Sequence, residues 1–205
     1  MLNLYSIGME KGLLYETIIT TKNKNGTPNA APIGVSCKNE SEIVLYLFEG
    51  THTSQNIKSD KRFIVNILKE PKIFVESTLG ELSSNSFKKH KNDFYIKNTD
   101  IFFSSKVKNI KKVEKKDNIG KTKLNIITAS PEEIIIINKN PEPLNRAIFA
   151  IIESLVYLSR IDIVDEKTST EYKARINEMS KIVSRTGGKN HKTAMKQILK
   201  HLNGK

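Results

Sequence analysis

The sequence contains a single cysteine, no tryptophan and only four histidines in 205 residues. Because Cys37 stands alone, an intrachain disulfide and a zinc site built from paired cysteines are both excluded. No two histidines have the HExxH spacing of zinc proteases, and no cluster of carboxylates accompanies them. We therefore expect no metal site.

Long apolar runs and glycine-rich nucleotide motifs are also missing. No apolar segment approaches the ~20 residues that a helix needs to cross a bilayer, so we expect no membrane span. The first residues, MLNLYSIGMEKG, have neither a basic region nor a long apolar stretch, which predicts a cytoplasmic protein without a signal peptide. No GxGxxG is present, and Gly188-Lys189 lacks the other residues of a phosphate-binding P-loop.

Positive charge is in excess, with a net charge of +12, and arginine supplies little of it. Between Lys88 and Lys123 the sequence carries many lysines and few acidic residues. Such a segment attracts anions, and a nucleic-acid-binding surface is one interpretation. The other is a solvated lysine face, which the scarcity of arginine, the usual reader of bases, favours.

Residues 1–140 have the period-two alternation and β-branched runs of strands. A hairpin turn is predicted at Asn25-Gly26, a short helix within Gly50–Asp60, and a long loop or lid over residues 77–99. Strands are predicted at Tyr15–Thr21, Asn29–Ser36, Ile43–Phe48, Arg62–Leu68, Ile101–Glu114 and Lys121–Thr128, the last two joined by a turn at Asn118–Gly120. We expect Ile43–Phe48 and Arg62–Leu68 to be buried on both faces. Six or seven strands at this spacing predict a barrel or sandwich.

The period changes to that of helices after Pro141. Apolar residues from Leu144 to Val156 form one wide helical face, and Thr168 with Glu171 has the pattern of a capping box that begins a second helix. Gly187-Gly188 ends that helix, and a third follows. The predicted organisation is therefore mainly β (α+β), with a β domain at 1–140 and a small three-helix subdomain at 141–205.

Two segments carry a functional signal. In Asn29–Val35 (NAAPIGV), small residues beside Pro32 let a flat ligand approach the strand backbone, although they also suit close packing against a neighbour. In Gly50–Ile57 (GTHTSQNI), hydroxyl, imidazole and amide groups follow a strand and begin a helix, where backbone N–H groups suit a phosphate. An ordinary helix cap at Thr51 or Thr53 is the alternative.

The order of these segments resembles that of the FMN-binding split-barrel superfamily, the flavin reductase-like and pyridoxamine-phosphate oxidase-like proteins. The elements of the resemblance are Asn29-x-Ala31-Pro32, Thr53-x-x-Asn56-Ile57 and Phe63-x-x-Asn66. Residues 15–21, the Gly26 turn, Asn29–Val35 and Asn145-Arg146-Ala147 are similar to an archaeal family, the domain of unknown function 447 family. The resemblance covers most of the chain, the helical tail included.

This resemblance implies an FMN-binding split β-barrel, a C-terminal helical subdomain and a homodimer. The strand Asn29, Ala31, Pro32, Ile33, Gly34 and Val35 would lie along the isoalloxazine ring, and Thr51, His52, Thr53 and Asn56 would hold the phosphate. Relatives often have arginine where this chain has His52, so Lys58, Lys61 or Arg62 would have to supply charge.

The resemblance therefore implies an FMN-binding flavoprotein, with an oxidoreductase as the expected activity. The sequence identifies neither the substrate nor the catalytic residues. A deazaflavin is the alternative cofactor, because its ring and phosphate are similar. Two other functions stay open: a basic nucleic-acid-binding protein that uses the 88–123 lysines, and a flavin-free split barrel that serves as a dimeric binding module.

Overall fold

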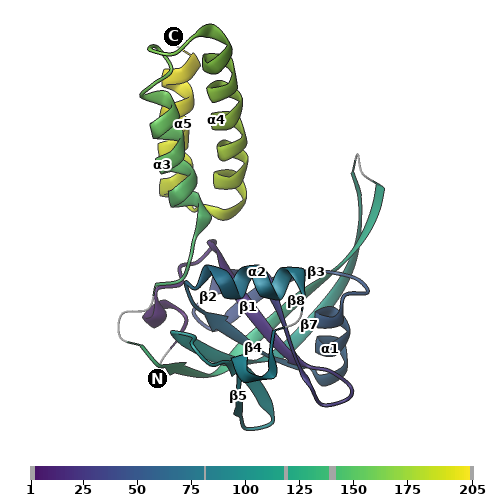
Figure 1. Cartoon of the computed structure of the whole chain (residues 1–205). Coiled ribbons are helices and arrows are strands. Elements are labelled where there is room, and N and C mark those ends of the chain that lie inside the picture. Colours follow the sequence, from purple (N-terminus) through teal and green to yellow (C-terminus); the bar gives the residue numbers. More distant parts are fainter. Residues whose placement is uncertain (1–2, 81, 118–119, 139–141, 204–205) are drawn as a thin grey trace. The chain divides into compact units, whose positions relative to one another are not determined.

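The computed structural model describes residues 3–80, 82–117, 120–138 and 142–203, and the chain forms two compact units (Figure 1). The first unit comprises residues 1–11 and 15–144, and the second comprises residues 12–14 and 145–205. The strands are β1 (Leu14–Lys22), β2 (Pro28–Asn39), β3 (Glu42–Phe48), β4 (Arg62–Ile67), β5 (Phe87–His90), β6 (Asp93–Ile96), β7 (Ile101–Asp117) and β8 (Gly120–Ile136). The helices are α1 (His52–Asp60), α2 (Pro71–Leu79), α3 (Arg146–Leu158), α4 (Glu166–Thr186) and α5 (Lys189–Asn203).

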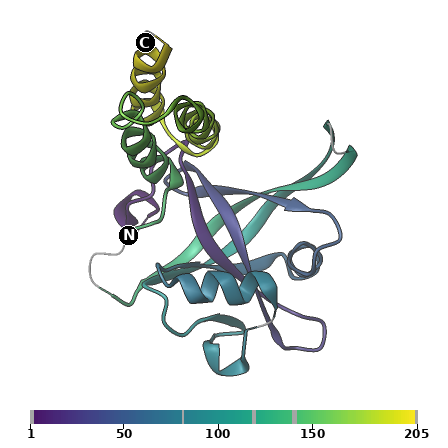
Figure 2. The ribbon, with the colours of Figure 1, turned by 45° about the horizontal axis from the view of Figure 1, so that its top comes forward.

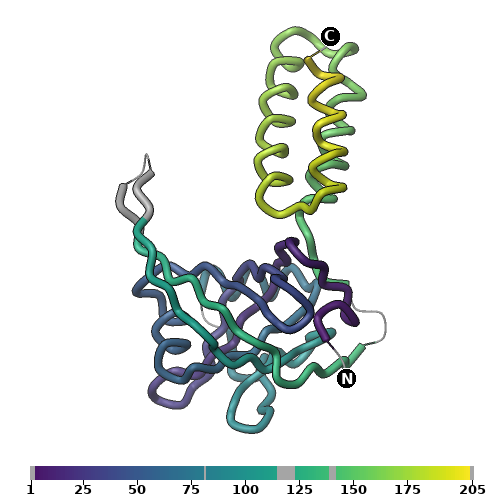
Figure 3. The backbone as a smooth tube through the Cα atoms, turned by 180° about the vertical axis from the view of Figure 1, so that it is seen from behind, coloured from purple at the N-terminus to yellow at the C-terminus, as the bar shows by residue number. Residues whose placement is uncertain are grey.

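Six strands close into a barrel in the order β1-β2-β3-β8-β7-β4, and β5 and β6 form a separate hairpin. Antiparallel registers join β1 to β4, β3 to β8 and β7 to β8, which confirms the predicted barrel. Alternate residues fill its interior; on β3 these are Ile43, Leu45 and Leu47. The pairing of β7 with β8 extends as far as Asp117 with Gly120, beyond the pair of Phe48 with Leu124 at the end of β3. Figure 3 shows β7 and β8 side by side along the barrel.

Helix α2 and the β5–β6 hairpin cover part of the outer face of the barrel (Figure 2). Phe74 of α2 and Phe87 of β5 pack against a buried cluster of Ile18, Leu68 and Ile96. This cover explains why β4 is buried on both faces, as the sequence predicts. Pro71 occupies the first turn of α2, where a missing N–H costs nothing.

Two sequence predictions are wrong in detail, and a third cannot be compared with the described residues. The strand β3 is buried on one face only, because Tyr46 and Phe48 on its outer face are 53% and 60% exposed. Residues 77–99 contain the end of α2 and the β5–β6 hairpin rather than only a loop. The predicted turn at Asn118–Gly120 lies largely outside the described residues, and Gly120 itself begins β8.

The second unit is a bundle of α3, α4 and α5 around buried apolar residues that include Ile151, Ile176 and Ile198. Helix α4 begins earlier than the predicted capping box, because the Asp165 side chain caps it by accepting from the N–H of Thr168. The helix ends at Gly187, as predicted.

Candidate functional site

The barrel opens where β2 separates from β3. The two strands pair from Asn39 with Glu42 to Val35 with Leu45, but the end of β3 continues along β8 alone, as far as Phe48. The preceding part of β2, residues 29–34, is consequently half-exposed, whereas Val35 is completely buried in the barrel. From the β1 side, the Thr17 hydroxyl donates to the carbonyl of Ile33 at 2.8 Å. Within the described residues, β3 does not pair with the opposite edge of this segment.

Helix α1 begins beside this opening. Thr51 is its N-cap: its hydroxyl oxygen accepts from the N–H of Ser54 at 3.3 Å and donates to the carbonyl of Phe48 at 3.1 Å. The Thr51 side chain therefore caps the helix, which is the alternative to phosphate binding given by the sequence analysis. The N–H groups of the next two residues, His52 and Thr53, are among those that an α-helix leaves without an internal partner. They are the backbone donors that this helix start offers to an anion.

A buried hydrogen-bond network joins β1, β2 and α1. The amide of Asn29 donates to the hydroxyls of Thr21 and Thr53, both at 3.1 Å. The amide of Asn56 donates to Thr21 at 3.0 Å and to Asn23 at 2.9 Å. Both amide hydrogens of Asn56 are thus used within the protein. The Thr53 hydroxyl accepts from Asn29 and donates to no acceptor within the described residues.

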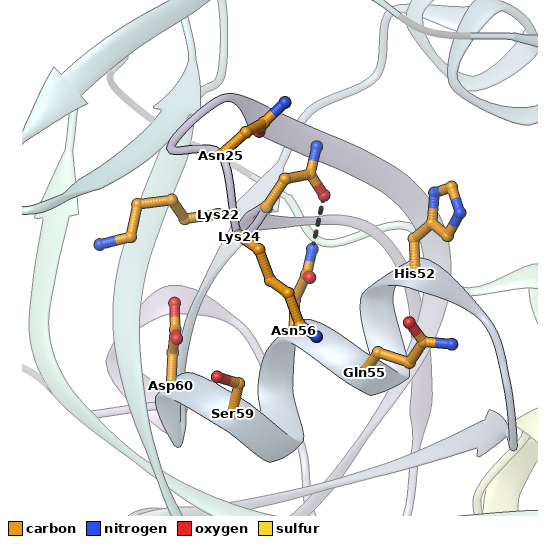
Figure 4. Close-up of a pocket in the computed structure, with 9 residues that line it drawn as sticks. Lys22, Lys24, Asn25, His52, Gln55, Asn56, Ser59 and Asp60 are labelled. Atoms are coloured by element: carbon orange, nitrogen blue, oxygen red, sulfur yellow. Dashed lines mark hydrogen bonds between the residues drawn. The ribbon is translucent and has the colours of Figure 1, made fainter.

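A pocket of about 410 Å³ lies between α1 and the β1–β2 hairpin (Figure 4). Its lining residues are Lys22, Asn23, Lys24, Asn25, His52, Gln55, Asn56, Ser59 and Asp60. The imidazole of His52 is exposed at its rim. The sequence-based prediction missed Lys22 and Lys24, although both are close to the predicted Asn25-Gly26 turn. The Lys24 side chain extends toward α1, whereas that of Lys22 points away from the helix (Figure 4).

Two of the three cations predicted to compensate for His52 have other partners, and the third, Lys61, is exposed at the C-cap of α1. Lys58 pairs with Glu49 at 3.2 Å, and Arg62 pairs with Asp93 and Glu132. Lys22 reaches the carbonyl of Asn92 at 3.5 Å. Among the lysines of the pocket, Lys24 is exposed on the turn and has no ion-pair partner within the described residues.

Several lysines of the barrel are paired with carboxylates. Lys38 and Lys108 both pair with Glu42. Their hydrogen bonds lower the pKa of this carboxyl to about 2, and the bond from Lys38 has the largest effect. Hydrogen bonds from Lys112 and Lys58 likewise lower the pKa of Glu49. These contacts favour the interpretation of the 88–123 lysines as a solvated, partly paired face.

Nowhere in the described residues do three or more histidine, cysteine, aspartate or glutamate side chains gather as a metal site would require. Within the same ranges no helix has the length and apolar character needed to cross a bilayer.

Comparison with known proteins identifies the class of fold and then the family. A flavin reductase-like protein with a split-barrel domain, from Shewanella frigidimarina, matches 68% of this chain and 81% of its own, with a TM-score of 0.50. Since the two sequences are only 11% identical, this likeness shows the split-barrel fold alone. The family model for the N-terminal domain of the DUF447 proteins of unknown function matches residues 15–138, and a second DUF447 model matches residues 145–200. The chain belongs to the DUF447 family, as its sequence motifs indicate.

Two archaeal relatives match almost the whole chain. An uncharacterized protein of Methanocaldococcus jannaschii is 31% identical over 196 residues, which are 93% of this chain and 99% of the relative. The crystal structure of an FMN-bound DUF447 protein from Methanosarcina mazei is 28% identical and covers 97% of this chain and 99% of its own, with a TM-score of 0.54.

Proposed function

We propose that this protein binds FMN at the opening between β2 and α1. The observation that carries the proposal is the hydrogen bond between Asn29 and Thr53, which joins the open strand edge to the helix start. An edge for a flat ring and a set of donors for a phosphate are thereby held next to each other. Membership of a family with an FMN-bound member in Methanosarcina mazei supports the same cofactor here.

Each part of the site has a separate role in this proposal. The backbone of residues 29–34 meets the polar edge of the isoalloxazine ring. The N–H groups of His52 and Thr53 and the Thr53 hydroxyl hold the phosphate, and Lys24 supplies positive charge nearby. Asn56 positions the β1–β2 hairpin by bonding to Thr21 and Asn23 and does not touch the ligand.

Bound FMN accepts and donates electrons singly or as a hydride, and the protein's share of such chemistry is to bind and orient the ring. We therefore propose a flavoprotein oxidoreductase whose substrate is not identified. In its domain organisation, residues 1–140 bind the flavin and residues 141–205 form an accessory helical subdomain.

A titration of the apo-protein with FMN tests the site. Replacing Thr53 with Ala should weaken FMN roughly tenfold, because one hydrogen bond contributes about 1 kcal/mol and a charged acceptor increases this value. His52→Arg should tighten binding, because arginine carries a permanent charge. Ser59→Ala is the matched control: this exposed residue lines the same pocket away from the helix start, and affinity should stay within twofold.

The outcome separates the proposed function from its alternatives. We expect a yellow protein with flavin absorbance, whose released ligand has the mass of FMN. A ligand with the mass of a deazaflavin would mean that the cofactor is a deazaflavin and not FMN. Equal dissociation constants for native, Thr53→Ala and His52→Arg proteins would place the phosphate elsewhere. A colourless protein that binds no added flavin would support the alternative of a dimeric binding module. Salt-dependent binding of DNA would support the nucleic-acid-binding function.

We also propose a homodimer, on the strength of exposed apolar surface. On the outer face of the barrel, Tyr46 and Phe48 are paired across the strands with Ile126 and Leu124 of β8. In the second unit, α3 has a second exposed apolar face. It consists of Phe149 and the exposed apolar side chains that follow it at helical spacing. Exposed apolar patches of this kind mark association surfaces.

Light scattering at micromolar protein should give the dimer mass. Phe48→Glu should shift the protein toward the monomer if the barrel face associates, and Ile152→Glu should do so if the α3 face associates. A monomer mass for the native protein with flavin bound would refute the dimer.

A further inference from the structure

A groove of about 270 Å³ runs between α4 and α5 in the helical unit. Its lining residues are Ser180, Val183, Ser184, Lys192, Met195, Lys196 and Leu199. Val183 and Met195 form a recessed floor, being 1% and 4% exposed, and Leu199 is half-buried at its side. The groove is close to the lower end of the ~300–1,000 Å³ range of ligand pockets, which suits one large apolar side chain.

The two serines do not make the groove polar. The Ser180 hydroxyl donates to the carbonyl of Asn177 at 2.7 Å, and the Ser184 hydroxyl donates to the carbonyl of Lys181 at 2.8 Å. Each hydrogen bond is made within α4, so neither hydroxyl proton is offered to the groove. The floor therefore provides apolar contact, and the flexible side chain of Met195 adapts to the shape of what enters.

Charge around this groove has one sign. The sequence from Met179 to Asn203 contains no aspartate or glutamate. The basic residues of this stretch are Lys181, Arg185, Lys189, Lys192, Lys196 and Lys200. Lys192 and Lys196 lie one helical turn apart on α5, are exposed and line the groove. Within the described residues, no ion pair involves either lysine, in contrast to Lys38 and Lys108 of the barrel.

We propose that this groove docks an acidic amphipathic segment of a partner protein. One large apolar side chain of the segment enters between α4 and α5, and carboxylates on either side of it pair with Lys192 and Lys196. The combination of an apolar recess with unpaired lysines at its rim is complementary to such a segment.

The same features disfavour the two other polyanionic partners. A nucleic-acid backbone pairs with lysines but has no apolar group to fill the recess. An anionic bilayer needs a protruding apolar face, whereas Val183 and Met195 lie at the bottom of a groove.

Fluorescence anisotropy with the full chain tests the proposal. The probe is a labelled helical peptide of about 15 residues, with glutamates around a single phenylalanine. Lys192→Gln/Lys196→Gln should weaken binding about tenfold, consistent with the loss of two charge pairs. The matched control, Lys189→Gln/Lys200→Gln, removes the same charge from α5 outside the groove lining and should change affinity less than twofold. Ser184→Glu, an exposed change that adds a negative charge at the rim, should also weaken binding.

A second peptide with alanine in place of the phenylalanine tests the apolar recess and should bind at least tenfold more weakly. Equal binding of the two peptides, or equal loss in the two lysine double variants, would overturn the proposal, because either result means attraction by net charge alone. Tighter binding to a DNA duplex or to phosphatidylglycerol vesicles than to the peptide would also overturn it. Circular dichroism of each variant verifies that the helices are intact.

Discussion

The side-chain amide of Asn29 on β2 donates a hydrogen bond of 3.1 Å to the hydroxyl of Thr53 in the first turn of α1. The Thr53 side chain is buried, so losing this donor leaves a buried oxygen with one partner fewer. Asn29→Ala should lower the free energy of unfolding by about 1–3 kcal/mol. Urea denaturation of the apo-protein measures this change, with the exposed Ser59→Ala on the same helix as the control. Equal stability of the Asn29→Ala and native proteins would mean that this bond does not hold strand and helix together.

Asn145 should contribute at least as much to the stability of the helical unit. Its amide donates to the carbonyls of Leu14 and Thr186, both at 2.9 Å, and its oxygen caps α3 by accepting from the N–H of Ala147. Asn145→Ala should destabilise this unit by about 2–4 kcal/mol, because it removes a cap and leaves two carbonyls without their donor.

Asn145→Ser separates the two contributions, since serine keeps a capping oxygen but cannot donate to both carbonyls. We expect it to recover about 1 kcal/mol, the usual value of a helix cap. If chemical denaturation gives the same loss for the serine and alanine variants, the amide donors dominate and the cap contributes little.

The barrel strands were predictable because inward and outward residues alternate with period two, and because Asn25-Gly26 fixes the first hairpin. The exposure of Tyr46 and Phe48 was not predictable, because an apolar run does not reveal whether another element covers the outer face of the strand. The β5–β6 hairpin was missed because its four-residue strands are too short for a clear period.

The candidate site divides in a similar way. Both segments, Asn29–Val35 and Gly50–Ile57, were identified from residue types alone, and the Asn29–Thr53 bond brings them together. The sequence did not reveal which of the predicted site residues form hydrogen bonds within the protein: Thr51 caps the helix, and Asn56 directs its amide to the β1–β2 hairpin. Such choices depend on side-chain direction, which spacing does not specify.

Glu42 should make stability depend on acid pH. Hydrogen bonds from Lys38 at 2.8 Å and Lys108 at 2.9 Å lower its pKa from 4.5 to about 2. A lowered carboxyl pKa favours the charged form in the folded state, so the stabilisation is complete above about pH 4.5 and is lost as the pH falls toward 2. The melting temperature of Glu42→Gln should therefore lie below that of the native protein at pH 7, and the difference should vanish near pH 2.

Other carboxylates titrate over the same range, so the readout is the difference between the two proteins and not the absolute melting temperature. Glu178→Gln, an exposed change on α4, controls for the loss of one negative charge. A difference that stays constant from pH 7 to pH 2 would show that the Glu42 ion pairs do not contribute.

Cys37 should be inert in the native protein. It is 1% exposed, its thiol donates to the carbonyl of Asn39 at 3.4 Å, and burial raises its pKa to about 11. Since the thiolate is the reactive form, both access and ionisation are suppressed at pH 8. A chromogenic disulfide reagent should label no thiol within minutes in buffer and one thiol per chain in denaturant. In Ser41→Cys, the added thiol lies on the exposed turn after β2 and serves as an internal control, which should react at once. Rapid labelling of the native protein would mean that β2 separates from the barrel far more often than its buried position implies.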